Sequence, residues 1–239
     1  MAREKIGRPL YMEPNSKQSQ TLELWLEDVQ SYIYKVTGPL MKHARFHFDR
    51  SQFIYSRKNK KSFEELSIIF LNKFPVNYRV GFQLEIWHPQ IRQIKESFMH
   101  EILNRESYLC SIILTTKDFS SRDPDREFVK GYPVRDYRDL FMAGDALTQT
   151  LQYELVPLCD RFSTIEHMDS FFESKPDWTL DSCSGGNICT DLIVAGLNRK
   201  RDLATRYEQL KKGIQQRIET RLMHPDSRQL LMLCYEAIR

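Results

Sequence analysis

Long apolar runs are missing from this 239-residue chain, and the N-terminal Met-Ala-Arg-Glu-Lys lacks the apolar core of a signal peptide. A membrane-spanning helix needs about 20 apolar residues in succession, and a secretory leader needs a shorter run behind its basic start. Cysteine is also sparse: the five residues are scattered, and no two have the C-x-x-C spacing of zinc or redox sites. We therefore expect a cytoplasmic protein in a reducing setting, without a membrane partner.

Catalytic motifs are missing as well, since the chain has neither the hydrolase motif G-x-S-x-G nor the phosphate-loop motif G-x-x-x-x-G-K. His43 and His47 are four residues apart, but we interpret their segment as a strand, which separates the two side chains. Asp160, Glu173 and Lys175 match a nuclease-like spacing, but we interpret them as solvated charges at helix ends. The sequence predicts no catalytic residue, no metal site and no cofactor.

Charge is nearly balanced, because 35 Lys and Arg residues and 32 Asp and Glu residues leave a net charge of +3. A surplus this small does not by itself indicate a nucleic-acid or membrane partner. The distribution is uneven: residues 35–79 hold ten basic and three acidic residues, net +7, whereas residues 118–177 hold seven basic and thirteen acidic residues, net −6. We expect these two segments either to face each other or to form opposite surfaces.

The strongest pattern in the chain runs from Val76 to Pro89 and reads V-N-Y-R-V-G-F-Q-L-E-I-W-H-P. Apolar residues at every second position indicate a strand with one buried and one exposed face. Pro89 ends it, because proline has no N–H to donate to a neighbouring strand. We expect a long strand in an antiparallel sheet whose apolar face is covered by helices. The residues of that face are Tyr78, Val80, Phe82, Leu84 and Ile86.

Patterns on either side predict the rest of the sheet. A helix over residues 20–36, ended by Thr37-Gly38-Pro39, precedes short strands at 44–48 and 52–57 and a central strand at 62–74. A helix at 90–103 and strands at 108–116 and 127–134 follow. The fold class is α+β: an antiparallel meander of about four to six strands, preceded by a helix and packed with a helical C-terminal half.

From Asp136 onward the apolar period changes to the 3.6 residues typical of helices. We predict a helix at 137–155 that precedes Pro157, and a short helix that is opened by a capping box of Ser163 and Glu166 and runs through Phe172. A loop at 175–186 and helices at 188–197, 202–222 and from Pro225 onward complete the chain. We divide it into an N-terminal arm (1–18), a sheet region (19–135) and a helical region (136–239), the last two forming one structural unit.

The outer face of the long strand carries the residues that we predict to bind another protein. These are Arg79, Gln83, Glu85 and Trp87. An outward-facing Trp in a strand either is covered by a helix or arm or serves as an interaction anchor. The polar residues beside it are also compatible with a plain wetted sheet surface.

The basic segment 35–79 supplies an alternative, nucleic-acid binding, because its cations alternate with aromatic residues. The candidate residues are Arg45, Arg50, Arg57, Lys58, Lys60 and Lys61. No RNP, KH or helix-turn-helix pattern accompanies them, and alternating aromatics also build the core of any antiparallel sheet.

Four stretches of the chain resemble a group of uncharacterised bacterial α+β proteins, some of which are linked with toxin–immunity or defence loci. They are the leading helix at 21–36, F-I-Y at 53–55, F-Q-L-E-I-W at 82–87 and L-C-D-R-F at 158–162 with the capped helix behind it. The resemblance implies a bacterial, non-enzymatic binding protein and transfers no functional residue.

The first hypothesis is therefore an adaptor or toxin-neutralising module that binds another protein through the exposed sheet face and the acidic segment 118–177. An acidic surface suits a basic partner such as a nuclease toxin. The second is a nucleic-acid-binding accessory factor that uses segment 35–79. The third is an enzyme of unrecognised type, which needs acids or histidines that meet only in three dimensions. None of these sequence features predicts whether the protein is a monomer or an oligomer.

Overall fold

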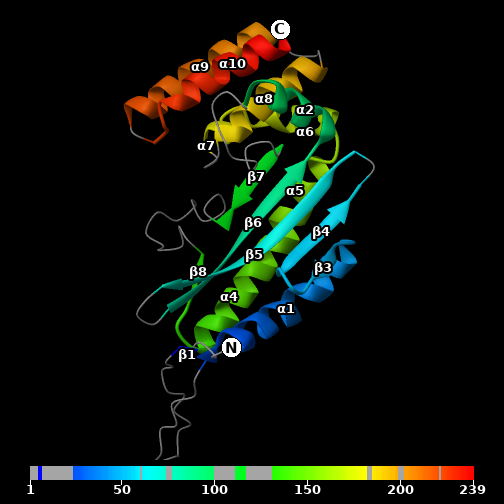
Figure 1. The fold of residues 1–239 in the computed structure, drawn as a ribbon, viewed down its shortest axis with the longest axis vertical. Coiled ribbons are helices and arrows are strands. Elements are labelled where there is room, and N and C mark those ends of the chain that lie inside the picture. The colour runs from blue at the N-terminus through cyan, green and yellow to red at the C-terminus, as the bar shows by residue number, and fades with distance from the viewer. Residues whose placement is uncertain are drawn as a thin grey trace, which may run out of the picture.

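The structure is a computed structural model that describes residues 5–6, 24–59, 61–73, 77–99, 111–116, 131–181, 185–198, 202–220 and 222–239. Its centre is a six-stranded antiparallel sheet in the order β3-β4-β5-β6-β7, with β8 also paired to β6 (Figure 1). The strands are β3 (His47–Asp49), β4 (Ile54–Lys58), β5 (Phe63–Lys73), β6 (Asn77–Trp87), β7 (Ile112–Thr115) and β8 (Tyr132–Val134). This sheet confirms the predicted α+β class and the antiparallel meander.

The long strand β6 matches its prediction closely. The side chains of Tyr78, Val80, Phe82, Leu84 and Ile86 are all at most 1% exposed, so the period of two did identify the buried face. β5 pairs with β6 over its whole length, from Phe63 opposite Trp87 to Lys73 opposite Asn77. The inner face is therefore a continuous apolar surface that must be covered.

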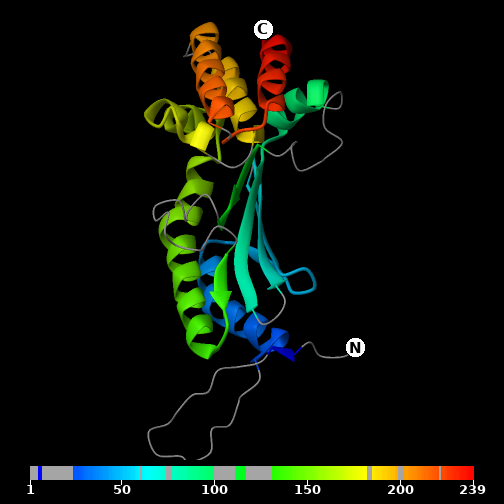
Figure 2. The ribbon, with the colours of Figure 1, turned by 90° about the vertical axis from the view of Figure 1, so that its left-hand side faces the viewer.

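Two helices cover the inner face, α1 (Leu26–His43) and α4 (Tyr137–Thr150), as Figures 1 and 2 show. The two helices also pack against each other. Aromatic rings join α1 to the sheet, where Tyr34 stacks on Phe48 at a centroid distance of 4.5 Å. Phe48 in turn contacts Phe53 and Tyr55. The other face of the sheet has no described helix on it.

The predicted bounds of the first helix were wrong at both ends. Leu24–Trp25 form a short strand, β2, which pairs with β1 (Lys5–Ile6), and α1 begins only at Leu26. The helix also continues through Pro39 to His43. Proline removes one helical hydrogen bond, but Met41 is buried in the core, and the Thr37 hydroxyl donates to the Ile33 carbonyl at 2.7 Å. Packing against the sheet thus overrides the local stop signal.

A second helix also runs through a proline, against the prediction that it would precede Pro157. α4 continues as one π-helical turn, η3 (Leu151–Leu155), and then as α5 (Val156–Arg161). The Val156 N–H donates to the carbonyl of Leu151, five residues back. Because a π turn is wider than an α turn, it reduces the clash between the proline ring and the carbonyl four residues earlier.

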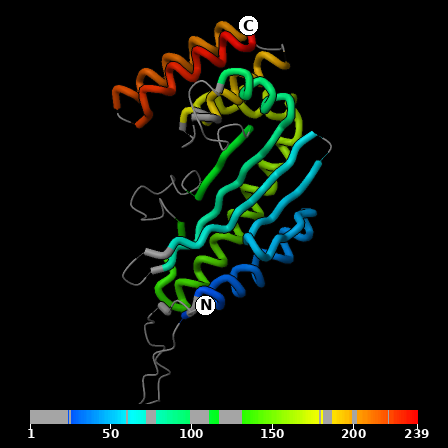
Figure 3. The backbone as a smooth tube through the Cα atoms, in the orientation of Figure 1, coloured from blue at the N-terminus to red at the C-terminus, as the bar shows by residue number. Residues whose placement is uncertain are grey.

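The remaining helices gather at one end of the sheet (Figures 1 and 3). They are α2 (Pro89–Met99), α6 (Ile165–Ser174), α7 (Trp178–Asp181), α8 (Gly185–Asn198), α9 (Leu203–Glu219) and α10 (Asp226–Ile238). Helix α8 lies at the centre: it contacts the other five and β7, and residues 187–195 are all buried. The C-terminal half is helical, as predicted. Its first helix, α4, lies along the inner face of the sheet, whereas α6 to α10 gather at the end of the sheet.

Smaller corrections concern caps and boundaries. Thr164, not Ser163, caps α6, because its Oγ1 accepts a hydrogen bond from the His167 N–H at 3.2 Å. The Ser163 hydroxyl instead donates to the Asp160 carbonyl at 2.7 Å. The loop predicted at 175–186 contains α7. The strand predicted at 44–48 starts at His47, because the preceding turn places Arg45 at φ 65°.

Some predicted segments fall partly outside the described residues. Of the 1–18 arm only Lys5–Ile6 is described, and residues 100–110 and 117–130 are outside, so the predicted elements at 90–103, 108–116 and 127–134 are seen only as α2, β7 and β8. Within the described parts of the chain, no helix is long and apolar enough to cross a membrane.

Candidate functional site

The register of the sheet defines the outer face, which is the face opposite α1 and α4 (Figure 2). Odd-numbered residues of β6 lie on it, and the strand partners of these residues lie beside them. The rows across the face are Lys58–Phe63–Trp87, Ser56–Glu65–Glu85–Ile113, Ile54–Ser67–Gln83–Thr115, Ile69–Gly81 and Leu71–Arg79–Pro133. Aliphatic, aromatic and charged side chains are therefore mixed on one surface.

All four residues predicted for a protein contact lie on the outer face, and each is half-buried. The structure brings three of them together, because Gln83, Glu85 and Trp87 follow one another along one side of β6. The Gln83 Nε2 donates to Glu85 Oε1 at 2.6 Å. Arg79 lies at the other end of the strand, between Leu71 and Pro133.

A pocket of about 550 Å³ opens at the Trp87 end of this face. Its aromatic lining is Phe63 and Trp87, which are direct cross-strand partners. Its charged lining is Glu65 and Glu85 from the two long strands, Lys58 and Lys61 from the β4–β5 connection, and Arg92 from α2. The volume is in the range of small-ligand and side-chain pockets.

Two carboxylates face each other in this pocket. Glu65 and Glu85 are directly opposite in the β5–β6 ladder, where facing Cβ atoms are about 5 Å apart and like charges are destabilising. Burial raises the pKa of Glu65, and the charge of Glu85 raises it further. Among the described residues neither carboxylate has an ion-pair partner, and Glu85 accepts a hydrogen bond only from Gln83. A cation bound between the two carboxylates would remove their repulsion.

The aromatic part of the pocket is partly occupied from one side. The Arg92 guanidinium lies over the Trp87 ring, 5.5 Å from its centroid. The Nε of Arg92 is also held by Glu96 Oε1 at 2.7 Å, one helical turn further along α2. Trp87 is thereby fixed in place while part of its surface still lines the pocket.

A second pocket, of about 410 Å³, adjoins the first and shares Lys61, His88 and Pro89 with it. Its far wall comes from α6 and α8, including Glu166 and Asn198. The two pockets therefore follow the junction between the end of the sheet and the helical bundle.

His88 is the most unusual side chain at this junction. It is 3% exposed, and neither ring nitrogen has a hydrogen-bond partner in the part of the chain that the structure describes. Its backbone is well held, because the N–H donates to Ser111 Oγ at 2.7 Å and the carbonyl accepts the Arg92 N–H at 2.9 Å. Burial lowers the pKa of His88 and Lys61 lowers it further, whereas Glu166 acts in the opposite direction. The imidazole is therefore neutral at pH 7.

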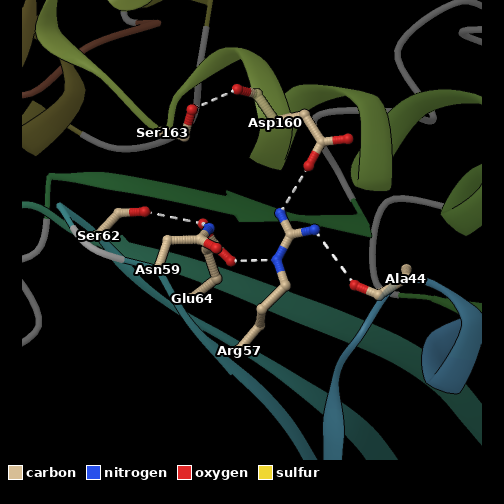
Figure 4. Close-up of polar contacts among 7 residues, drawn as sticks. All are labelled: Ala44, Arg57, Asn59, Ser62, Glu64, Asp160 and Ser163. Carbon is tan, nitrogen blue, oxygen red and sulfur yellow. Dashed lines mark hydrogen bonds and ion pairs between the residues drawn. The ribbon is translucent and has the colours of Figure 1, made fainter.

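Arg57, one of the residues predicted for nucleic-acid binding, is used inside the fold (Figure 4). Its Nε donates to Glu64 Oε2 at 2.6 Å, its Nη1 to the Ala44 carbonyl at 3.2 Å, and its Nη2 pairs with Asp160 Oδ1 at 2.9 Å. The Glu64 side chain is fully buried and also accepts hydrogen bonds from an amide and a hydroxyl of the β4–β5 connection. Through the Arg57–Asp160 ion pair, this network joins the basic segment 35–79 to the acidic segment 118–177. At this one contact the two segments face each other, which is one of the two arrangements expected from the sequence.

The other basic candidates are divided between two places. Arg45 and Arg50 are exposed around β3, at the edge of the sheet, whereas Lys58 and Lys61 line the first pocket. Lys60 lies outside the described residues. The structure thus brings Lys58 and Lys61 to the same pocket as Glu85 and Trp87, which the sequence assigned to a different function.

The described acids of the acidic segment lie on or beside helices and not on the strands of the sheet. Its described part is carried largely by α4, η3, α5 and α6, and α4 lies on the opposite side of the sheet (Figure 2). Several of its acids act within the fold: Asp136 caps α4, Asp139 pairs with Arg135, and Asp160 pairs with Arg57. Among the described residues, the acids of this segment and the outer face of the sheet therefore do not form one surface, and the site considered below is the sheet face.

Sequence reasoning missed Glu65 and Arg92 as site residues. Glu65 lies in a strand whose apolar residues alternate poorly, so that only its register against β6 reveals that it faces Glu85. Arg92 reaches the pocket because α2 begins at Pro89, two residues after the end of β6. The residue pattern of one strand alone therefore predicts neither the pairing of Glu65 with Glu85 nor the position of Arg92 in the pocket.

Neither a metal-ligating cluster among the described residues nor a similar known protein helps to interpret this site. Among the described residues, no group of three or more His, Cys, Asp or Glu side chains is placed to hold a metal ion. The chain matches no family model, no curated protein and no solved structure. The bacterial family that the sequence resembles thus stays an expectation.

Proposed function

We propose that this protein is a non-enzymatic binding protein that holds another protein on the outer face of its sheet. The partner inserts an arginine or lysine side chain between Glu65 and Glu85. The observation that carries this proposal is the pair of facing carboxylates beside Phe63 and Trp87, on a sheet face that has no described helix on it.

The chemistry of the pocket favours a guanidinium. A planar guanidinium donates two parallel hydrogen bonds to a carboxylate and also stacks on aromatic rings. Trp and Tyr surrounded by polar groups are the usual energetic centres of protein interfaces. Here Trp87 provides such a centre, and Gln83 fixes the orientation of the Glu85 carboxylate.

The cations of the same pocket orient the partner. Lys58 and Lys61 lie on the β4–β5 connection, and no ion pair joins them to Glu65 or Glu85 among the described residues. An acidic group of the partner therefore fits at the lysine end and its basic group at the glutamate end. A basic partner such as a nuclease toxin, which the acidic segment 118–177 led us to expect, is one protein with this chemistry.

The test is an NMR titration with N-acetyl-arginine amide, with the neutral N-acetyl-citrulline amide as the matched probe. We expect saturable shifts of the Trp87 indole N–H with the arginine probe in the millimolar range and none with citrulline. The double variant E65Q/E85Q should abolish the shifts. The control E173Q removes one exposed carboxylate on α6 and should leave them unchanged.

The same variants then test a whole partner. A protein captured by the wild type and by E173Q, but lost with E65Q/E85Q, would be held through this pocket. Equal binding of the arginine and citrulline probes, or equal binding by wild type and double variant, would remove the basis of the proposal.

Nucleic-acid binding remains a second candidate because Lys58, Lys61 and Arg92 line one pocket with Phe63 and Trp87. Cations beside aromatic rings are the usual elements of single-strand binding sites. Filter binding of a single-stranded oligonucleotide over a salt series distinguishes this function. Affinity that falls steeply with salt, and that decreases in K58Q/K61Q but not in E65Q/E85Q, would favour nucleic acid over a protein partner.

A further inference from the structure

The second pocket differs from the first in its chemistry, because it lies at the beginning of a helix and includes a buried imidazole without a partner. We propose that this pocket binds a small ligand with a phosphate or carboxylate group, held by Lys61, His88 and the N–H of Gln90 in the first turn of α2. The ligand does not depend on the protein partner proposed above.

The start of α2 is suited to an anion. Pro89 is its first residue, and the first internal hydrogen bond runs from the Arg92 N–H to the His88 carbonyl. The Gln90 N–H therefore has no acceptor within the helix, and Gln90 lines the pocket, whereas Ile91 is fully buried and does not line it. The first turn has no acidic residue, so the positive end of the helix dipole is not neutralised by a side chain of the helix itself.

His88 supplies the independent indication of a ligand. A buried polar group without a hydrogen bond is costly, yet among the described residues both nitrogens of this imidazole lack a partner while the residue lines both pockets. An oxygen of a ligand bound in the second pocket would supply the missing partner. The N–H of the neutral imidazole then donates to the anion that the helix start attracts.

Lys61 adds the charge. Its side chain is exposed on the β4–β5 connection and lines the pocket from the sheet side. A flexible lysine can approach a phosphate or carboxylate without disturbing the fold, because it acts as a point charge with three donors.

The opposite wall restricts the rest of the ligand. Glu166 on α6 and Asn198 on α8 line this wall, and Asn198 uses its Nδ2 to donate to Asp169 at 2.6 Å. The Oδ1 atom of Asn198 can accept a hydrogen bond. The ligand should therefore be anionic at the α2 end and carry a hydroxyl or amino group at the Asn198 end.

The test is a titration of the wild type with inorganic phosphate and, separately, with acetate, followed through the His88 ring resonances. Sodium chloride is kept at about 150 mM, where the Debye length is about 8 Å. We expect saturable binding of at least one anion, and the anion that binds identifies the group. Binding should be about tenfold weaker in K61Q, which loses a charge-assisted hydrogen bond.

Two further variants give the proposal a signature that a general salt effect cannot produce. E166Q removes a like charge from the far wall and should tighten binding. K58Q removes a cation that lines only the first pocket and should change the affinity less than twofold, as a control. Thermal unfolding of each variant verifies that the fold is intact.

The pH dependence provides a second readout. The groups that face His88 are Lys61 from the β4–β5 connection and Glu166 from α6, with Lys58, Arg92, Glu65 and Glu85 around the first pocket. A bound anion stabilises the protonated imidazole, so saturating phosphate or acetate should raise the pKa of His88. No shift of the His88 resonances with either anion up to about 50 mM, a weak-binding limit, would overturn the proposal. Equal affinities of K61Q, K58Q and E166Q would overturn it too.

Discussion

At the scale of single residues, Arg57 shows how a charge is accommodated in the core. Its three guanidinium nitrogens are held by Glu64, by the Ala44 carbonyl and by Asp160, which belong to three separate segments. A buried ion pair stabilises a fold only when its geometry is good and its remaining polar atoms are satisfied. The carboxylate meets the second condition, because Glu64 also accepts two further hydrogen bonds, whereas Arg57 Nη2 has only its ion pair with Asp160 and no hydrogen bond among the described residues.

Replacement of Glu64 by glutamine should reveal this dependence. The variant E64Q leaves the half-buried Arg57 without its buried counter-charge, and we expect a loss of about 3 kcal/mol in the free energy of unfolding. Urea denaturation followed by circular dichroism measures it. The control is D160N, because the Asp160 side chain is 65% exposed and such a pair contributes less than about 1 kcal/mol. Equal losses in the two variants would contradict the assigned roles.

The same residues show why a candidate site is harder to predict than a strand. The sequence places Arg57 among exposed lysines, because its partner Glu64 is brought opposite it only by the β4–β5 register. Glu65 is hidden for the same reason. In contrast, Glu85 and Trp87 could be placed on the outer face from the alternation within β6 alone.

At the scale of elements, the contact between α1 and α4 depends on one glycine. A Cβ atom at Gly144 would lie 2.7 Å from Cε1 of Tyr32, closer than such atoms can approach. The Tyr32 ring is itself packed edge-on against Phe141 at a centroid distance of 5.0 Å. The two helices that cover the sheet therefore approach as closely as they do because position 144 has no side chain.

A pair of glycine-to-alanine variants tests this contact. In an exposed or loosely packed helix, Gly→Ala stabilises by about 1 kcal/mol. We expect this gain for G196A, where the added Cβ meets only ordinary contacts at 3.5 Å or more. We expect G144A to lose about 1–2 kcal/mol instead, because overpacking moves Tyr32. Thermal and urea unfolding give both signs, and a gain at both positions would show that α1 and α4 are not in close contact.

Elements were predictable where their own pattern decides their structure. The period of two in β6 and the period of 3.6 after Asp136 are local properties, and the structure confirms both. The passage of α1 through Pro39 and of the α4–α5 rod through Pro157 was not predictable, since the reason for each lies outside the segment. For α1 this reason is burial of Met41 in the core, and for the rod it is the π turn before the proline.

At the scale of the whole molecule, the sheet and the helical bundle are joined by polar contacts at β7. The Asn187 amide of α8 accepts from the Ile113 N–H at 3.0 Å and donates to the Ile113 carbonyl at 2.9 Å. Next to it, the Thr190 hydroxyl is hydrogen-bonded to the Ser111 carbonyl. These contacts hold the bundle to the sheet, and the single structural unit of regions 19–135 and 136–239 stays a prediction.

Removal of the Asn187 amide should weaken this connection. N187A leaves both backbone groups of Ile113 without their partner, and we expect a loss of about 2 kcal/mol. The exposed Gln152 serves as control, since Q152A should change stability by no more than about 0.5 kcal/mol. Fluorescence and circular dichroism followed together in urea should give coincident transitions for the wild type. Separate transitions in the wild type would show two independently folding parts.

The position of the Asn187 amide also limits how this protein can associate. It occupies the donor and acceptor of β7 that an incoming chain would need in order to extend the ladder. Growth of the sheet at Ile113, whether by strand donation, domain exchange or fibril formation, therefore requires α8 to move away first. Loss of this one side chain would weaken the hold of α8 on β7 and make that displacement easier.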